Sequence, residues 1–123
     1  MSLIILSTKK LELKEEKAAQ LYYDLGYYKA AAVAFSTLCD NYPDAENGDQ
    51  YKLYEIKSYY KYAEMSIVDK QTERYQKVID ACEDFEMRYP DSKLKADATE
   101  YKNNSQNKIN KIANEQTTSS NKQ

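Results

Sequence analysis

The sequence predicts an all-α fold, a superhelix of about five helices arranged as two repeats plus a terminal helix. The first observation behind this prediction is one apolar pattern that occurs twice, each copy closing on Tyr-Pro-Asp. The copies comprise Tyr28, Ala31, Ala34, Phe35, Leu38 and Tyr42-Pro43-Asp44, then Tyr75, Val78, Ala81, Cys82, Phe85 and Tyr89-Pro90-Asp91. This spacing lays one stripe along a helix, which Pro ends because it lacks a backbone N–H. A repeat cannot bury its stripe alone, so stacking is expected, and stacked repeats usually form binding surfaces rather than catalytic pockets.

The second observation is the composition. A chain of 123 residues can hold one domain, and 41% hydrophobic with 31% charged residues is ordinary for a helical one. Only two Gly and two Pro are present, which favours long helices joined by short connections. The formal net charge of −2 predicts no strong attraction to nucleic acid or to an anionic membrane.

The first helix is expected over residues 3–25 and the second over residues 28–42. Gly26 separates them, and its tolerance of positive φ suits the end of a helix. The segment 43–48, which reads Pro-Asp-Ala-Glu-Asn-Gly, is expected to form a turn.

The third helix is expected to begin with Asp49 as its N-cap and to run to about residue 66. A loop over residues 67–71 then leads to a fourth helix over 72–89, with Thr72 as the candidate N-cap. Asp91-Ser92 leads into a fifth helix over residues 93–112.

The sequence divides into a repeat domain, residues 1–112, and a polar tail, residues 113–123. The tail has no apolar periodicity, so disorder is expected there. The thirteen tyrosines are interpreted mainly as packing residues at helix–helix seams, and the remainder could line a binding groove.

Several residue types needed for catalysis are missing. The chain has no His, the commonest general base and transition-metal ligand, and no Gly-rich phosphate loop. The acidic neighbours Glu83-Asp84 and Glu86 are interpreted as a solvated helix face rather than a carboxylate pair or cation site. No enzyme activity, metal or cofactor is therefore expected.

The two cysteines lack Cys-x-x-Cys spacing, so zinc and thioredoxin-like chemistry are not expected. Cys82 occupies the stripe position of Phe35 and is expected to be a buried hydrophobe. Cys39 corresponds to Glu86 and is expected to be exposed, so the two thiols should not meet as a disulfide.

The spacing resembles the tetratricopeptide repeat, a 34-residue helix pair that carries Ala-x-x-x-Phe with Pro eight residues after the aromatic. Ala31, Phe35 and Pro43 match it, and Gly26 and Tyr28 fall where that family places the turn between helices. The Tyr-Tyr pairs 22–23 and 59–60 are 37 residues apart, whereas the Tyr-Pro-Asp triplets are 47 apart. The second repeat is therefore expected to carry about ten extra residues between its helices, as a long loop around Glu64 to Arg74.

A narrower resemblance covers about residues 4 to 112. The chain resembles the C-terminal part of the BamD family, tetratricopeptide lipoproteins of the outer-membrane β-barrel assembly machinery, in its Bacteroidetes form. The resemblance rests on Leu21-Tyr22-Tyr23-Asp24-Leu25-Gly26-Tyr27-Tyr28-Lys29-Ala30-Ala31, on Tyr62-Ala63-Glu64 with Ser66-Ile67, on Lys70-Gln71 with Glu73-Arg74-Tyr75-Gln76-Lys77, and on Arg88-Tyr89-Pro90-Asp91-Ser92-Lys93. The long loop is its most specific element.

The resemblance implies a non-catalytic scaffold on the periplasmic face of the cell outer membrane. The C-terminal repeats of this family dock the periplasmic domains of the barrel-forming BamA subunit and other assembly-complex subunits. Family members carry about five repeats and an N-terminal lipid-bearing Cys, so a C-terminal fragment is expected here, with the membrane anchor upstream of it.

The first helix of each tetratricopeptide pair lines the concave face of the array. Counting from the matched positions gives six candidate partner-binding residues on that face: Glu16, Gln20, Tyr23, Leu53, Lys57 and Tyr60.

Two rival functions fit less well. A cytosolic co-chaperone adaptor would need a clamp of Lys, Asn and Arg residues for a carboxylate, where this chain has Glu16, Gln20 and Tyr54. An outer-membrane glycan-binding lipoprotein would need a large insertion with an aromatic platform. A generic periplasmic tetratricopeptide adaptor that binds another protein stays open as the alternative. The apolar run Leu3-Ile4-Ile5-Leu6 is expected to cause non-biological self-association.

Overall fold

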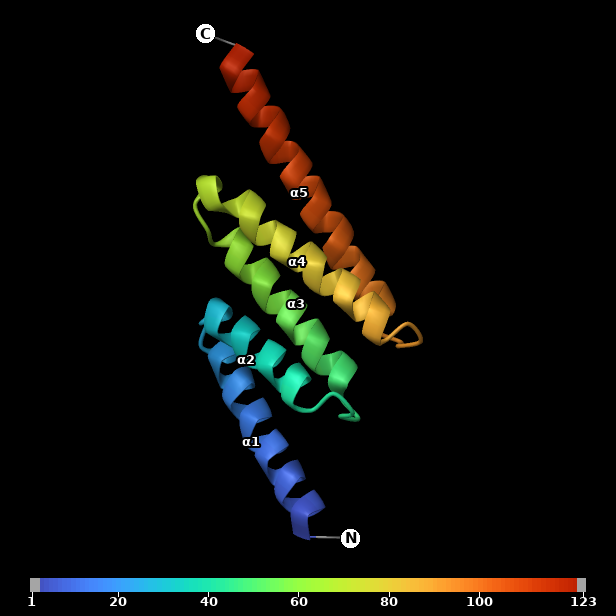
Figure 1. Ribbon diagram of the computed structural model, residues 1–123. Helices are drawn as coiled ribbons and strands as arrows, with labels where there is room; N and C mark the ends of the chain where they lie inside the picture. Colours follow the sequence, from blue (N-terminus) through green and yellow to red (C-terminus); the bar gives the residue numbers. More distant parts are fainter. Residues whose placement is uncertain (1–2, 122–123) are drawn as a thin grey trace.

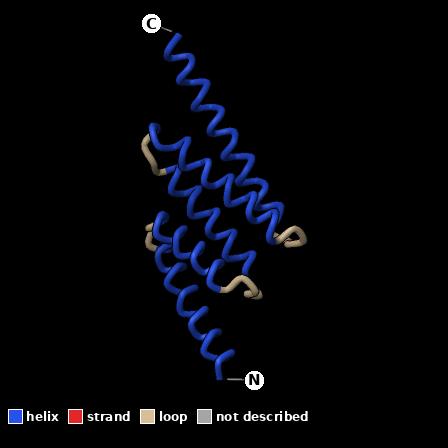
Figure 2. Tube along the Cα trace, in the orientation of Figure 1, coloured by secondary structure: helices blue, strands red, loops and turns tan. Residues whose placement is uncertain are grey.

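The computed structural model describes residues 3–121, and every element in that range is a helix (Figures 1 and 2). The helices are α1 (Leu3–Asp24), α2 (Tyr28–Asn41), α3 (Gly48–Glu64), α4 (Val68–Arg88) and α5 (Lys95–Asn121). Each helix packs on the next one along the chain, and α3 also contacts α5. The all-α, repeat-like fold predicted from the sequence is confirmed.

The helices form a stepped stack with the two chain ends at opposite ends (Figure 1). The α1–α2 and α3–α4 connections lie along one edge of the stack, and the α2–α3 and α4–α5 connections lie along the other. The pair α3–α4 therefore repeats the up-and-down course of the pair α1–α2, and α5 continues the stack, as in a solenoid.

The duplicated stripe forms the core. Phe35 on α2 packs with Ala31, Leu38 and Tyr51 in a cluster shared by α1, α2 and α3. Phe85 on α4 packs with Ile56 and Val78 in a second cluster shared by α3, α4 and α5. Helix α3 contributes to both clusters, so it is the central element that joins the repeats.

The first turn forms as predicted. Gly26 has a φ of +83°, in the left-handed region. The Gly26 N–H donates to the Tyr23 carbonyl at 3.0 Å, and the Tyr27 N–H donates to the Tyr22 carbonyl at 2.9 Å. This pair of bonds is the Schellman arrangement, which satisfies the last carbonyls of α1.

The N-cap predicted at Asp49 is wrong. Helix α3 begins at Gly48, after Asn47, which makes no side-chain cap bond. The Asp49 carboxylate instead accepts hydrogen bonds from the Gln50 N–H at 2.9 Å and from the Ser92 hydroxyl at 2.6 Å. Asp49 therefore ties the start of α3 to the α4–α5 connection, a long-range role that local sequence does not reveal.

The long loop predicted around Glu64 to Arg74 is also wrong. Helix α4 begins at Val68, not Thr72, and the connection consists of Met65, Ser66 and Ile67. The extra residues lengthen the helices instead, since α4 has 21 residues where α2 has 14. No Gly or Pro interrupts residues 68–72, so the helix can start early.

The tail expected to be disordered continues α5, which is helical to Asn121. Residues 113–117 are exposed, and the Thr117 hydroxyl donates to the Ala113 carbonyl at 2.9 Å. The missing apolar periodicity therefore indicates a missing packing partner rather than a missing helix, because nothing in the segment breaks the backbone ladder.

Candidate protein-docking surfaces

The three candidates on α1 make contacts within the chain. The Gln20 amide donates to Asp24 at 2.9 Å. The Tyr51 hydroxyl lies 2.6 Å from Glu12 and 3.3 Å from Glu16, and burial together with Glu12 raises the pKa of Tyr51. Glu16 therefore helps to hold α3 against α1.

Tyr23 and Tyr60 are seam residues. The Tyr23 ring meets Tyr28 and Tyr54 edge-on, each at 5.4 Å between ring centroids. The Tyr60 ring meets Tyr75 at 5.6 Å and Tyr101 at 5.3 Å in the same geometry. Such edge-to-face pairs stabilise packing, so both rings are half-buried parts of the fold.

Leu53 is buried in the core, whereas Lys57 lines a surface hollow. Leu53 is only 6% exposed and belongs to the second core cluster, so its placement on a partner-facing surface was wrong. The Lys57 ammonium lies 4.9 Å from the centre of the Tyr54 ring. Lys57 also lines a hollow of about 380 Å³ with the α5 residues Asp97, Glu100, Tyr101 and Asn104.

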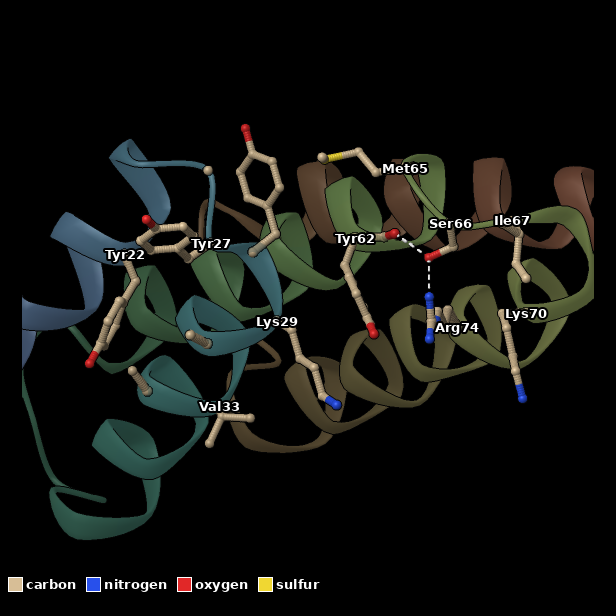
Figure 3. A pocket seen from close by; sticks show the side chains of 14 residues that line it. Tyr22, Tyr27, Lys29, Val33, Tyr62, Met65, Ser66, Ile67, Lys70 and Arg74 are labelled. Carbon is tan, nitrogen blue, oxygen red and sulfur yellow. Dashed lines mark hydrogen bonds between the residues drawn. The ribbon is translucent and has the colours of Figure 1, made fainter.

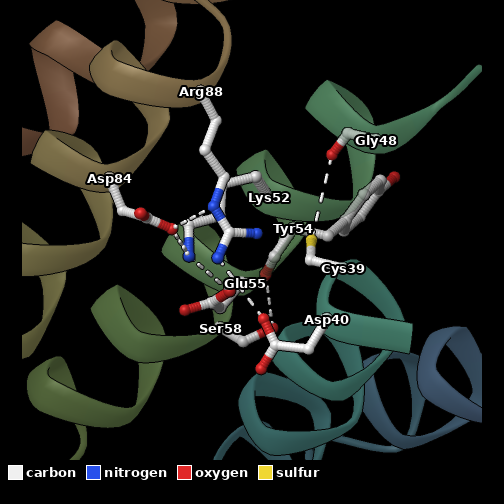
Figure 4. Close-up of polar contacts among 9 residues, drawn as sticks. All are labelled: Cys39, Asp40, Gly48, Lys52, Tyr54, Glu55, Ser58, Asp84 and Arg88. Atoms are coloured by element: carbon white, nitrogen blue, oxygen red, sulfur yellow. Dashed lines mark hydrogen bonds and ion pairs between the residues drawn. The ribbon is translucent and has the colours of Figure 1, made fainter. Parts of the chain in front are cut away.

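Asp84 does not lie on a solvated face as the sequence suggested. Its carboxylate lies 2.6 Å from the Lys52 ammonium and 3.2 Å from the Arg88 guanidinium (Figure 4). Lys52 also pairs with Glu55 at 3.0 Å, and Arg88 with Asp40 at 3.4 Å. The cluster joins α2, α3 and α4, so these charges serve the stack.

Burial and charge pairing oppose each other at both ends of the Lys52–Glu55 pair. Burial lowers the pKa of Lys52, but attraction to Glu55 and Asp84 outweighs burial and leaves that pKa raised. Burial raises the pKa of Glu55 more than Lys52 lowers it. Removing Lys52 would leave the buried Glu55 carboxylate without an ion-pair partner among the described residues, whereas Lys52 would keep Asp84 if Glu55 were removed.

Cys39 is buried, contrary to the expectation of an exposed thiol. Its Sγ lies 3.9 Å from the Gly48 carbonyl, where α2 meets the start of α3. Cys82 is buried as expected. Burial raises the pKa of each thiol to about 12, so neither is a thiolate near neutral pH.

A groove of about 1130 Å³ lies between the α1–α2 corner and the α3–α4 corner (Figure 3). Its walls come from Tyr27, from Val33 on α2, and from Met65 and Ile67 in the α3–α4 connection. These side chains are 54–70% exposed, and we call this surface the corner groove. Exposed apolar side chains that gather around one hollow make this surface a candidate protein-binding site.

Three cations line the corner groove together with the apolar side chains. Lys29 extends from α2, while Lys70 and Arg74 come from the first turns of α4 (Figure 3). The Arg74 guanidinium lies 4.3 Å from the centre of the Tyr62 ring and donates to the Ser66 hydroxyl at 2.6 Å. Arg74 is therefore held in place, whereas the two lysines project freely on their stems.

The sequence interpretation missed the corner groove because it placed residues 67–71 in a loop. One signal was available: Met65, Ile67 and Val68 are apolar residues in an otherwise polar run. Since they close a helix corner rather than continue a stripe, a search for helical periodicity passes over them.

Comparison with models of known protein families gives no match, and comparison with curated proteins gives none either. Within residues 3–121, no helix is long and apolar enough to cross a membrane. The described part of the chain also has no group of three or more His, Cys, Asp or Glu side chains placed to hold a metal.

Proposed function

We propose that the chain is a non-catalytic scaffold that docks another protein. The observation that carries this proposal is the corner groove, where Tyr27, Met65 and Ile67 are each at least 60% exposed around one hollow. A partner that covers these side chains gains the free energy of apolar burial, and tyrosines are common among the residues that dominate interface energetics. A volume of about 1130 Å³ in so open a groove suits a protein segment better than a small molecule.

The finer part of the proposal concerns the partner. The BamD resemblance supports the periplasmic domains of a BamA-like subunit, at the outer membrane, as the bound protein. The residues quoted for that resemblance support it, while its most specific element, the long loop, is replaced by a longer α4. The alternative is a generic periplasmic adaptor that uses the same groove for another protein.

The test is a calorimetric titration of this chain with purified periplasmic domains of a BamA-like protein, which measures the dissociation constant. Ile67→Glu places a charge in the corner groove and should weaken binding at least tenfold. Met87→Glu is the matched control, because Met87 lies on α4 outside the groove and is 77% exposed. Absence of binding by the unmodified chain would contradict the BamA-like partner.

A second pair of variants separates the two faces of the array. Lys57→Ala removes the one concave candidate that projects into an open hollow, without disturbing a core cluster. If Lys57→Ala weakens binding and Ile67→Glu does not, the partner binds the concave face and the corner groove is not the docking site.

A further inference from the structure

We propose that the corner groove selects an acidic amphipathic segment of its partner, with bulky apolar side chains flanked by Asp or Glu. The inference rests on the proposed docking function and adds the chemistry of the bound segment. The carboxylates of that segment would pair with Arg74, Lys70 and Lys29, while its apolar side chains cover Val33, Met65 and Ile67.

The apolar half of the groove is shaped for large side chains. Ala30 and Ala34 of α2 leave space next to Val33, and Tyr62 lies across from them on α3. Met65 adapts to different shapes because its side chain is unbranched and flexible. Burial of apolar side chains here supplies affinity, but it does not distinguish one apolar segment from another.

The charged half supplies that distinction. The groove is lined by three cations and by no carboxylate among the described residues. None of the three cations forms an ion pair with a side chain that the structure describes, whereas Lys52, Arg88 and Lys102 all do. Asp69 and Glu73 are neighbours of these cations on α4, but neither lines the groove.

Arg74 is the cation of the corner groove whose side chain is already held in position for binding. Stacking on Tyr62 and the hydrogen bond to Ser66 fix the guanidinium before a partner arrives. That bond uses Nη1, and no described residue accepts a hydrogen bond from Nε or Nη2. This free edge can donate two parallel hydrogen bonds to one carboxylate. Because the guanidinium is already held in place, little side-chain entropy is lost when the carboxylate binds.

Charge also argues against the other occupants. The chain's own apolar run Leu3–Leu6 is followed by Lys9 and Lys10, so a second copy would bring positive charge to a positive groove. A membrane is flat and cannot fill a hollow between two helix corners, and the chain's net charge of −2 opposes attraction to anionic lipid.

The experiment is a selection of random 12-residue displayed peptides on the immobilised full chain. Peptides that also bind a Val33→Glu, Ile67→Glu double variant are removed. The expected survivors combine Leu, Phe or Ile with Asp or Glu. The dissociation constant of one survivor and of its Glu→Gln version is then measured by fluorescence anisotropy.

The Glu→Gln peptide should bind at least tenfold more weakly. Arg74→Gln and Lys70→Gln should each weaken the acidic peptide and leave the Gln version unchanged, while Lys77→Gln, an exposed control on α4, should change neither. Lys70→Gln keeps the test valid if Arg74→Gln disturbs the Ser66 turn, which circular dichroism would report.

Survivors without acidic residues, or equal affinity for the Glu and Gln peptides, would overturn the inference and leave the docking function standing. No survivors, together with unchanged binding of partner domains by Ile67→Glu, would overturn the inference and move the docking site away from the corner groove. No survivors, together with no binding of partner domains by the unmodified chain, would overturn both the inference and the docking function. Binding of the chain to phosphatidylglycerol vesicles that Ile67→Glu abolishes would assign the groove to lipid. A dimer that Ile67→Glu dissociates would assign it to a second copy.

Discussion

At the scale of single residues, the duplicated stripe explains stability. Phe35 is 1% exposed and stacks on Tyr54 at 5.2 Å between ring centroids, and Phe85 lies at the equivalent depth in the second cluster. Each ring fills a site where three helices meet, so its removal would leave a cavity that the neighbours fill only in part.

Phe35→Ala should therefore lower the free energy of unfolding by about 3–5 kcal/mol, which is a large share of the stability of a small domain. Urea denaturation followed by circular dichroism measures this loss. Val33→Ala is the control on the same helix, because Val33 is exposed and should cost little. An unchanged midpoint for Phe35→Ala would contradict the helical register.

The two thiols make stability sensitive to alkaline pH. Their pKa is about 12 in the folded chain and 9.0 ordinarily, so the unfolded chain loses these protons first as pH rises. The contribution of the two protonated thiols to the free energy of unfolding is therefore complete below pH 9 and is lost as pH rises toward 12.

Urea midpoints measured between pH 8 and pH 10 test this linkage. The unmodified chain should lose stability above pH 9, and a Cys39→Ala, Cys82→Ala variant should lose less over the same interval. Tyr23 and Tyr75, whose pKa burial raises, add their own loss of stability above the ordinary tyrosine pKa of 10.0, in both proteins alike. Identical slopes below pH 10 would contradict the assignment to the thiols.

At the scale of elements, the two glycines act for different reasons. Gly26 has positive φ and open space around it, so its role is conformational. Gly48 starts α3 under the Tyr89 ring, and a Cβ there would lie 2.6 Å from the Tyr89 hydroxyl oxygen. The first glycine makes a turn, and the second allows two repeats to approach.

Gly48→Ala should destabilise the chain although Ala is the better helix former, because Tyr89 must move. Tyr89→Phe removes the closest atom, so the double variant should recover part of the loss. Gly26→Ala should gain nothing from Tyr89→Phe, which makes it the matched control. Thermal melts of the single and double variants give the comparison. The contact would be refuted if Gly48→Ala lowered the melting temperature equally with and without Tyr89→Phe.

At the scale of the whole molecule, the two ends of the stack differ. Helix α5 exposes residues 113–117, four of them polar, beyond Ile112, whereas α1 exposes Leu11, Ala18 and Leu21 at spacings that share one face. Residues 3–6 form the start of the same helix, although their side chains lie outside those that the structure describes. An apolar helix face of this extent favours association.

The chain should therefore dimerise through α1 at high concentration. Light scattering should show a higher molar mass for the unmodified chain than for an Ile4→Glu, Ile5→Glu variant, and Leu21→Glu should act in the same direction. Ile67→Glu, at the corner groove, should leave the mass unchanged. A monomeric unmodified chain would refute the prediction.

The sequence by itself determined the features that depend on neighbours along the chain. The stripe that includes Phe35 and Phe85 follows from helical spacing, and the end of α1 follows from the freedom of Gly26 to take positive φ. These could be predicted because backbone geometry and side-chain period act over a few residues.

Only the tertiary structure decided which helix faces meet. It buried Leu53 and Cys39, paired Asp84 with Lys52, and began α4 at Val68, so that a predicted loop became one wall of the corner groove. Two candidate tyrosines, Tyr23 and Tyr60, became seam residues for the same reason. Burial and charge pairing depend on residues far apart in sequence, and the periodicity of one helix carries no record of the helix that packs against it.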